Sequence, residues 1–128
     1  LAHRYGAQVL VNADMAVARD AGADGVHLQA AQLLQYRIRP DTRLLEASCH
    51  NRQELQHAAE LGGDFAVLSP VLPTQSHPGA PTLGWEQFSE LCLDLPMPVY
   101  ALGGMRTDMI RMAMNHGAHG VALLSGIW

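Results

Sequence analysis

The chain has 128 residues, 48% of them hydrophobic, and its 12 acidic and 8 basic residues give a net charge of −4. All the basic residues are arginine, which excludes Schiff-base chemistry and a lysine phosphate anchor, because both need a lysine amine. The acidic balance and the scattered arginines argue against nucleic acid as a partner of this domain. The length predicts one domain with a hydrophobic core.

The cysteines indicate a reducing compartment, and the hydropathy pattern argues against a membrane helix and a signal peptide. Cys49 and Cys92 stand apart, without the spacing of a zinc site or of a disulfide framework. The longest uncharged run, residues 65–85, contains four prolines, so it cannot form a membrane helix and we expect no membrane partner. No basic segment followed by an apolar run begins the chain, which predicts a cytoplasmic protein.

Short runs rich in Val and Leu predict buried strands of a parallel sheet. They cover residues 8–11, 25–28, 44–47, 65–69, 99–102 and 120–124. Their starts lie 17 to 34 residues apart, close to the length of a strand with a crossover helix. Three of the segments between them end at Gly22, Gly62 and Gly117, each followed by a tight turn and the next strand. The pattern predicts a run of βα repeats.

These repeats predict an α/β fold of the TIM (βα)8 barrel type, with an open doubly wound sheet as the alternative. The chain supplies about six of the eight βα units of such a barrel. Residues 1–6 resemble the last turn of a helix, and the chain stops directly after a strand. We therefore expect residues 1–128 to be a C-terminal fragment of one barrel domain that lacks the N-terminal units. Its open sheet edges predict self-association.

In such barrels the loops that follow the strands bind ligands. Gly103-Gly104 and Ser125-Gly126 follow the last two predicted strands, and Arg106 is nearby. Glycine lets backbone N–H groups approach an anion closely, so these loops predict a phosphate site. The alternative is a pair of plain tight turns.

His50 follows the third predicted strand and is the candidate acid/base group, because histidine titrates near neutrality. The alternative is a loop histidine at the start of the next helix, where Asn51 and Glu54 have the spacing of a capping box. We interpret Cys49 as a packing residue, since adjacent strand side chains point in opposite directions. His27 lies inside an apolar strand and is interpreted as a core histidine.

The loop from Ser69 to Trp85 is polar, stiffened by proline and far longer than a usual βα connection. Such loops often cover or bind ligands. Thr74, Ser76 and His77 are the donors that it offers to an anion. The alternative is a rigid surface loop that only covers the mouth of the barrel.

Several short motifs, in order along the whole chain, match one known superfamily. They are Asn12, Gly25-Val26-His27-Leu28, Ser48-x-His50, Ser69-Pro70-Val71-Leu72-Pro73-Thr74, Leu83-Gly84, Ala101-Leu102-Gly103-Gly104 and Leu124-Ser125-Gly126-Ile127. As a set they resemble the thiamine phosphate synthases and TenI-like thiazole tautomerases. Residues 69–81 and 126–128 further resemble the C-terminal domain of bacterial two-domain proteins that carry a MutT-type Nudix hydrolase in front.

The resemblance implies a (βα)8 barrel of thiamine metabolism. Synthases of the superfamily are transferases that join a pyrimidine pyrophosphate to a thiazole phosphate, with Mg²⁺ on the pyrophosphate. The tautomerases are isomerases that use a histidine and no metal, and by position the resemblance implies His50 in that role. It also implies ligand binding by Asn12, Ser48, Thr74 and Ser76, and phosphate binding by Gly103, Gly104 and Ser125.

The chain departs from the synthase pattern where the superfamily binds metal. Ala13 replaces the Asp of an Asn-Asp pair, and residues 29–32 read Gln-Ala-Ala-Gln in place of a Gly-Gln-Glu-Asp-like run. Mg²⁺ is usually held by carboxylates, so it remains a candidate cofactor whose protein ligands are replaced. His77 stands where the superfamily has a phosphate-binding lysine. These departures argue against synthase activity and leave metal-free tautomerisation.

Two hypotheses of function stay open. The first is an enzyme domain of thiamine metabolism, either a degenerate synthase or a tautomerase that acts on a thiazole phosphate. The second is a non-catalytic domain that binds a phosphorylated ligand and regulates a covalently linked Nudix hydrolase, whose activity would lie outside this chain. Both predict a phosphorylated small molecule as partner, and ligand binding without turnover would favour the second.

Overall fold

The computed structural model describes residues 1–12 and 14–127. The strands in this part of the chain are β1 (Leu10–Asn12), β2 (Gly25–Leu28), β3 (Leu44–Cys49), β4 (Phe65–Leu68), β5 (Val99–Ala101) and β6 (Gly120–Val121). Every neighbouring pair is parallel, and the order in the sheet is the order in the chain. A doubly wound sheet reverses its strand order at a switch point, so the sequential order identifies a barrel wall. The predicted TIM-barrel class is confirmed.

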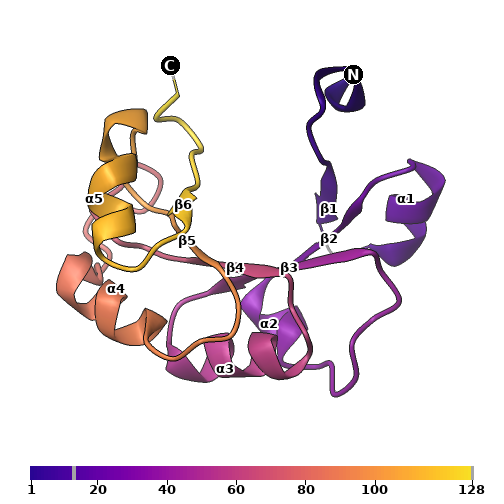
Figure 1. Cartoon of the computed structure of the whole chain (residues 1–128), viewed down its shortest axis with the longest axis horizontal. Helices are drawn as coiled ribbons and strands as arrows, with labels where there is room; N and C mark the ends of the chain where they lie inside the picture. Colours follow the sequence, from indigo (N-terminus) through magenta and orange to yellow (C-terminus); the bar gives the residue numbers. More distant parts are fainter. Residues whose placement is uncertain (13, 128) are drawn as a thin grey trace.

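The α-helices cover the outer, convex face of the sheet (Figure 1). The helical segments are η1 (Ala2–Tyr5), α1 (Met15–Asp20), α2 (Ala30–Leu33), α3 (Arg52–Glu60), α4 (Gly84–Cys92), η2 (Thr107–Met109) and α5 (Ile110–Asn115). The sheet curves but does not close, and β1 and β6 form its two edges in the described chain. The self-association expected from these edges stays a prediction. None of the described helices is long and apolar enough to cross a membrane.

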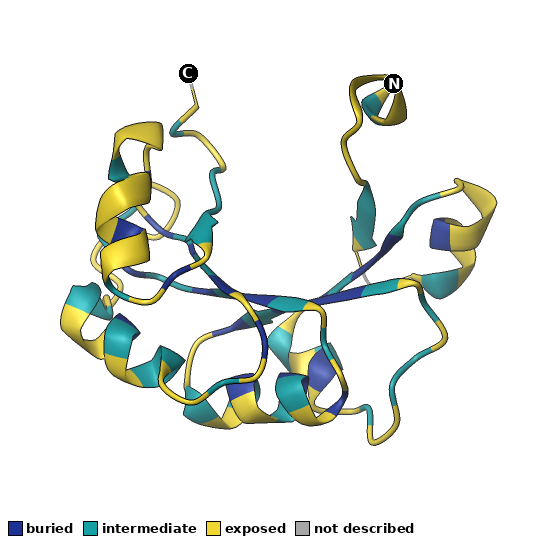
Figure 2. Ribbon diagram, in the orientation of Figure 1, coloured by how far each residue is buried: buried dark blue, intermediate teal, exposed yellow. Residues whose placement is uncertain are grey.

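The core lies between the sheet and the helices, as the buried residues in Figure 2 show. Along β3, Leu45, Ala47 and Cys49 are at most 1% exposed and belong to the same core as Leu55 and Ala58 of α3. Burying one such aliphatic side chain contributes about 1.5–3 kcal/mol. Because strand side chains alternate between faces, the residues between these three point to the inner, concave face.

The predicted strands are confirmed, with changes at some of their ends. Residues 25–28 coincide with β2. β1 begins two residues late, because the N–H of Val9 donates to the carboxylate of Asp24 at 2.7 Å. β6 ends at Val121, since the chain then bends over the loop after β5, where Gly126 lies directly against the carbonyl of Met105.

The predicted helix stops are also confirmed. Gly22, Gly62 and Gly117 have φ angles of 64°, 73° and 93°, in the left-handed region that glycine adopts without strain. Residues 2–5 form a short 3-10 helix, which also ends at a left-handed glycine, Gly6.

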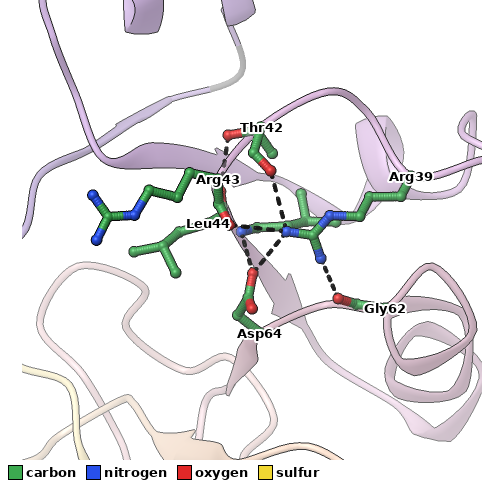
Figure 3. Close-up of polar contacts among 7 residues, drawn as sticks. Arg39, Thr42, Arg43, Leu44, Gly62 and Asp64 are labelled. Atoms are coloured by element: carbon green, nitrogen blue, oxygen red, sulfur yellow. Dashed lines mark hydrogen bonds and ion pairs between the residues drawn. The ribbon is translucent and has the colours of Figure 1, made fainter.

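The amino ends of β3 and β4 are joined by one arginine (Figure 3). The guanidinium of Arg39 donates to the backbone carbonyls of Thr42, Arg43 and Gly62, and to Oδ2 of Asp64 at 2.9 Å. The same carboxylate oxygen accepts the N–H of Leu45 at 2.8 Å. Burial alone would raise the pKa of Asp64, but the hydrogen bonds from Leu45 and Arg39 outweigh it, and the pKa is lowered. This cluster fixes the end of the sheet opposite the candidate site.

Candidate functional site

A cavity of about 530 Å³ lies where the chain leaves the carboxyl ends of β3, β4, β5 and β6. Most of the residues predicted from sequence line it, namely His50, Thr74, Ser76, His77, Gly103, Gly104 and Ser125. Arg106 also lines it, whereas Asn12 and Ser48 do not. Segments far apart in the chain meet here because parallel strands present their carboxyl ends at one edge of a sheet. The binding role of these residues stays a prediction.

His50 stands at the end of β3 and is fixed by the first turn of α3. Asn51 caps this helix, its side chain accepting the N–H of Glu54 at 2.9 Å. The carboxylate of Glu54 reaches back past Asn51 and accepts the N–H of His50 at 2.6 Å, so the predicted capping box forms with a shifted partner. The same oxygen lies 3.0 Å from Nδ1 of His50. A carboxylate accepts hydrogen bonds, so Nδ1 carries the hydrogen and Nε2 is left for exchange with a ligand.

The long loop after β4 forms one wall of the cavity. Its ends are pinned together, since the N–H of Leu83 donates to the carbonyl of Pro70 and the N–H of Gly84 to that of Val71, each at 2.9 Å. Val71 is fully buried, which anchors the loop in the core. Within the loop, the N–H of His77 donates to Oγ1 of Thr74 at 3.1 Å. The loop is therefore held at its base and presents its polar middle to the cavity.

The glycines after β5 allow close contact with this loop. Gly103 and Gly104 have φ angles of 103° and 68°. A Cβ on Gly103 would lie 2.8 Å from Cα of Pro70, and one on Gly104 would lie 2.8 Å from the carbonyl oxygen of Pro73. Loop packing thus explains why glycine is needed here, and the phosphate role predicted from sequence is a separate proposal.

Arg106 supplies a cation beside these glycines. Its Nε lies 3.2 Å from Oδ1 of Asp108, and both side chains are largely exposed. Exposed ion pairs are weak, so Asp108 holds Arg106 loosely and leaves it able to contact an anion.

The two predicted residues outside the cavity belong to a second polar group on the inner face. Asn12 pairs in register with His27, and Oγ of Ser48 lies 3.4 Å from Nε2 of His27. Nδ1 of His27 is hydrogen-bonded to Glu46, a residue only 2% exposed. The sequence analysis did not single out Glu46, although a lone carboxylate inside an apolar strand run was a signal for it.

Cys49 fits the packing role that was predicted for it. Burial raises the pKa of the Cys49 thiol to about 12 and that of Cys92 to about 11. Cys49 is fully buried while His50 is exposed, so the two neighbours face apart as expected. A reactive cysteine needs a lowered pKa and exposure, so neither thiol is a nucleophile of this site.

The described residues do not fit a Mg²⁺ ion. Ala13 lies outside the described residues, and Oδ1 of the neighbouring Asp14 caps α1 by accepting the N–H groups of Ala16 and Val17. Residues 29–32 are the second place where the chain departs from the synthase pattern, and there Oε1 of Gln32 accepts the N–H of Gln29 at the start of α2. No group of three or more His, Cys, Asp or Glu side chains that could hold a metal occurs in residues 1–12 and 14–127.

Comparison with known proteins places the chain in a family. The profile of the TMP-TENI family, thiamine monophosphate synthase, matches residues 1–127. The chain is 34% identical to the thiamine-phosphate synthase of Thioalkalivibrio sulfidiphilus, covering 100% of this chain and 63% of that protein. It is 35% identical to the thiamine-phosphate synthase of Thermosynechococcus vestitus, covering 99% of this chain and 37% of that protein.

A solved structure of a protein with a related name has a similar fold. Thiamine phosphate pyrophosphorylase from Pyrococcus furiosus superimposes with a TM-score of 0.76 at 26% identity, covering 96% of this chain and 60% of that one. The chain thus spans less than two thirds of each of these three proteins. On the profile match and the shared parallel α/β architecture, the chain belongs to the thiamine monophosphate synthase family.

Proposed function

We propose that the cavity binds a thiazole phosphate and that His50 moves protons on this ligand in a metal-free tautomerisation. The observation that carries the proposal is the composition of the cavity wall, where two histidines, His50 and His77, meet glycine-containing turns and an arginine. The wall offers neutral hydrogen-bond donors and one cation, which suits a phosphorylated heterocycle. Family membership supports thiamine metabolism as the setting.

The anion end of the site lies at the turns after β5 and β6. Gly103, Gly104, Ser125 and Arg106 all line this part of the wall. Backbone N–H groups in such turns and a guanidinium bind phosphate oxygens well. Thr74, Ser76 and His77 face the same cavity from the loop after β4 and add donors for the ligand.

The reactive end is His50. Glu54 holds Nδ1 of the ring, so Nε2 faces a ligand atom with its lone pair when the ring is neutral and with a proton when the ring is charged. In a tautomerisation a base removes a proton at one ring atom and an acid returns one at another, with no net loss of protons. The replaced carboxylates do not affect this chemistry, because it needs no metal, and they are the reason that we do not propose synthase activity.

The experiment is calorimetric titration with thiazole phosphate, paired with a turnover assay. His50→Ala is expected to abolish turnover and leave the dissociation constant of the ligand unchanged. Ser125→Ala is expected to weaken binding and leave the chemistry of bound ligand intact. Equal loss of ligand binding in His50→Ala would make His50 structural and contradict its acid/base role.

The second candidate is a non-catalytic ligand-binding domain covalently linked to a Nudix hydrolase. It is supported by the location of the proposed phosphate-binding groups, which lie on turns after β5 and β6 and not on the segment after β3 that carries His50. Wild-type protein that binds thiazole phosphate and shows no turnover would support this candidate over the tautomerase.

A further inference from the structure

A row of polar side chains crosses the inner face of β1, β2 and β3. The register places Asn12 beside His27 and His27 beside Glu46. Ser48 shares this face because it stands two residues after Glu46 on β3. The side chain of Glu46 is 3% exposed and that of His27 is 29% exposed. Burying a carboxylate costs free energy unless the group is paired, so the contact between Glu46 and its partner stabilises this row.

The contacts lead from Glu46 through His27 to Ser48. Nδ1 of His27 donates to Oε2 of Glu46, and Nε2 of His27 lies 3.4 Å from Oγ of Ser48. Because the carboxylate accepts, Nδ1 keeps its hydrogen and Nε2 is the atom that gains or loses a proton. The hydrogen bond to Glu46 raises the pKa of His27, although burial opposes the rise. His27 is therefore suited to hold a proton near neutrality.

Ser48 is well placed relative to His50. The two residues are two positions apart at the end of β3, so they lie on the same side of the chain with about 7 Å between their Cα atoms. His50 lines the cavity, whereas Ser48 lies outside its wall, with Oγ 3.4 Å from Nε2 of His27.

A tautomerisation removes a proton from one ring atom and adds one to another, and two separate groups can share these two transfers, with His50 as one of them. We infer that Ser48 is the second, supplied with protons through His27 and Glu46, and that it acts on a phosphorylated heterocycle held between the cavity and the inner face. The inference rests on the proposed function. In it, Ser48 touches the substrate as a catalytic residue, while His27 and Glu46 are positioning residues that act through it.

The proton balance of the step closes within the site. The O–H bond of Ser48 breaks as a ring atom of the substrate takes that proton. The Nε2–H bond of His27 breaks as Oγ of Ser48 takes a new proton, and His27 becomes neutral. His50 takes the proton that leaves the ring, so the number of protons on protein and substrate together is unchanged. Solvent then returns the two histidines to their starting states.

The pH dependence of this relay follows from few charges. Glu46 is the charged group that acts on His27. In register, Asn12 of β1 lies beside His27 and Phe65 of β4 lies beside Glu46, and both of these side chains are uncharged. Glu46→Gln therefore lowers the pKa of His27 and moves the arm of the pH–rate profile that reports His27 to lower pH.

The test compares turnover and binding of thiazole phosphate in Ser48→Ala, His27→Gln and Glu46→Gln. We expect Ser48→Ala and His27→Gln to lower kcat by about 100-fold, the lower end for loss of an acid/base group, with little change in the dissociation constant. In Glu46→Gln the pH–rate profile and the NMR titration of the His27 ring shift together to lower pH. Ser89→Ala on α4 and His119→Gln before β6 are matched controls outside the cavity wall and are expected to match wild type.

Each alternative outcome is distinct. Ser48→Ala that loses binding and keeps kcat would make Ser48 a binding residue and overturn the relay, as would an unmoved pH profile in Glu46→Gln. If Glu46→Gln does not fold, Ser48→Ala decides, because it removes only a hydroxyl. Turnover that needs His50 but not Ser48 refutes the relay and leaves the proposed function standing. Wild-type protein that does not bind thiazole phosphate refutes both.

Discussion

Glu54 holds His50 through a single carboxylate oxygen, which accepts the backbone N–H of His50 at 2.6 Å and lies 3.0 Å from its Nδ1. The side chain of Glu54 is 13% exposed, so water competes little for this contact. One residue thus sets both the backbone position and the ring orientation of the candidate acid/base group.

Glu54→Ala tests this relationship. Loss of the carboxylate frees the ring of His50, so we expect turnover to fall on the order of 10-fold, as for other partners that orient a functional histidine, with ligand binding retained. Glu54→Gln keeps an acceptor oxygen and is expected to restore part of the turnover. Steady-state kinetics of the two variants check this, and identical rates in both and in wild type would show that Glu54 has no orienting role.

Substitutions of Arg106 and of Asp108 are expected to change the affinity for an anion in opposite directions. Arg106→Ala is expected to weaken binding of thiazole phosphate by about fivefold, since an exposed ionic contact contributes up to about 1 kcal/mol. Asp108→Asn removes the competing carboxylate and is expected to tighten binding by a smaller factor. Titration calorimetry at low salt measures both, and parallel changes in the two variants would place Arg106 outside the phosphate site.

Gly103→Ala is expected to destabilise the fold and to displace the loop after β4. The substitution forces a side chain into φ 103° and brings a Cβ within 2.8 Å of Cα of Pro70. Gly79→Ala is the control, because Gly79 has φ 74° with nothing within 4 Å of a built Cβ. Backbone strain costs about 1–2 kcal/mol at either site, and overpacking adds about 1–3 kcal/mol at Gly103 alone. Denaturant unfolding compares them, and equal losses would argue against the close contact.

The two cysteines predict low thiol reactivity in the native protein. With pKa values raised to about 12 for Cys49 and about 11 for Cys92, almost no thiolate is present at pH 8. We expect slow reaction with Ellman's reagent, with the half-buried Cys92 ahead of the buried Cys49. Guanidinium chloride should release two thiols. Rapid labelling of Cys49 without denaturant would contradict its packing role.

The Arg39–Asp64 pair predicts a component of acid unfolding. The pKa of Asp64 is lowered below 3.8 in the folded state, so its contribution to stability is present above pH 3.8 and is lost as the pH falls through the folded pKa. Arg39→Ala is expected to lower the melting temperature at pH 7, with a smaller difference from wild type at the acid end. Thermal melts across pH 2–7 measure this, and a constant difference would exclude the pair as the cause.

The fold was largely predictable because its signals are local. Residues 25–28 are apolar apart from His27, and Gly22 and Gly62 mark helix ends, so these strands and turns could each be predicted from a short stretch of sequence. The end of β6 was not, since it depends on how Gly126 packs against Met105 on another loop.

The candidate site was predictable where it depends on strand ends and not where it depends on register. His50 and Gly103 follow strands, so their place at one cavity could be foreseen. The pairing of His27 with Glu46 joins residues 19 positions apart and is decided by the alignment of β2 and β3, which no short motif encodes. The sequence does not show which face of the sheet His27 lies on. It was therefore interpreted as a core residue, whereas it lies half-buried on the inner face.

The most direct measurement of the central claim is calorimetric titration of the chain with thiazole phosphate, in the presence and absence of Mg²⁺. The turns that we propose to bind phosphate line the cavity, and no group of three or more His, Cys, Asp or Glu side chains that could hold a metal occurs in the described residues, so the predicted result is binding with the same dissociation constant in both conditions. Absence of binding, or binding that appears only with Mg²⁺, would contradict the account.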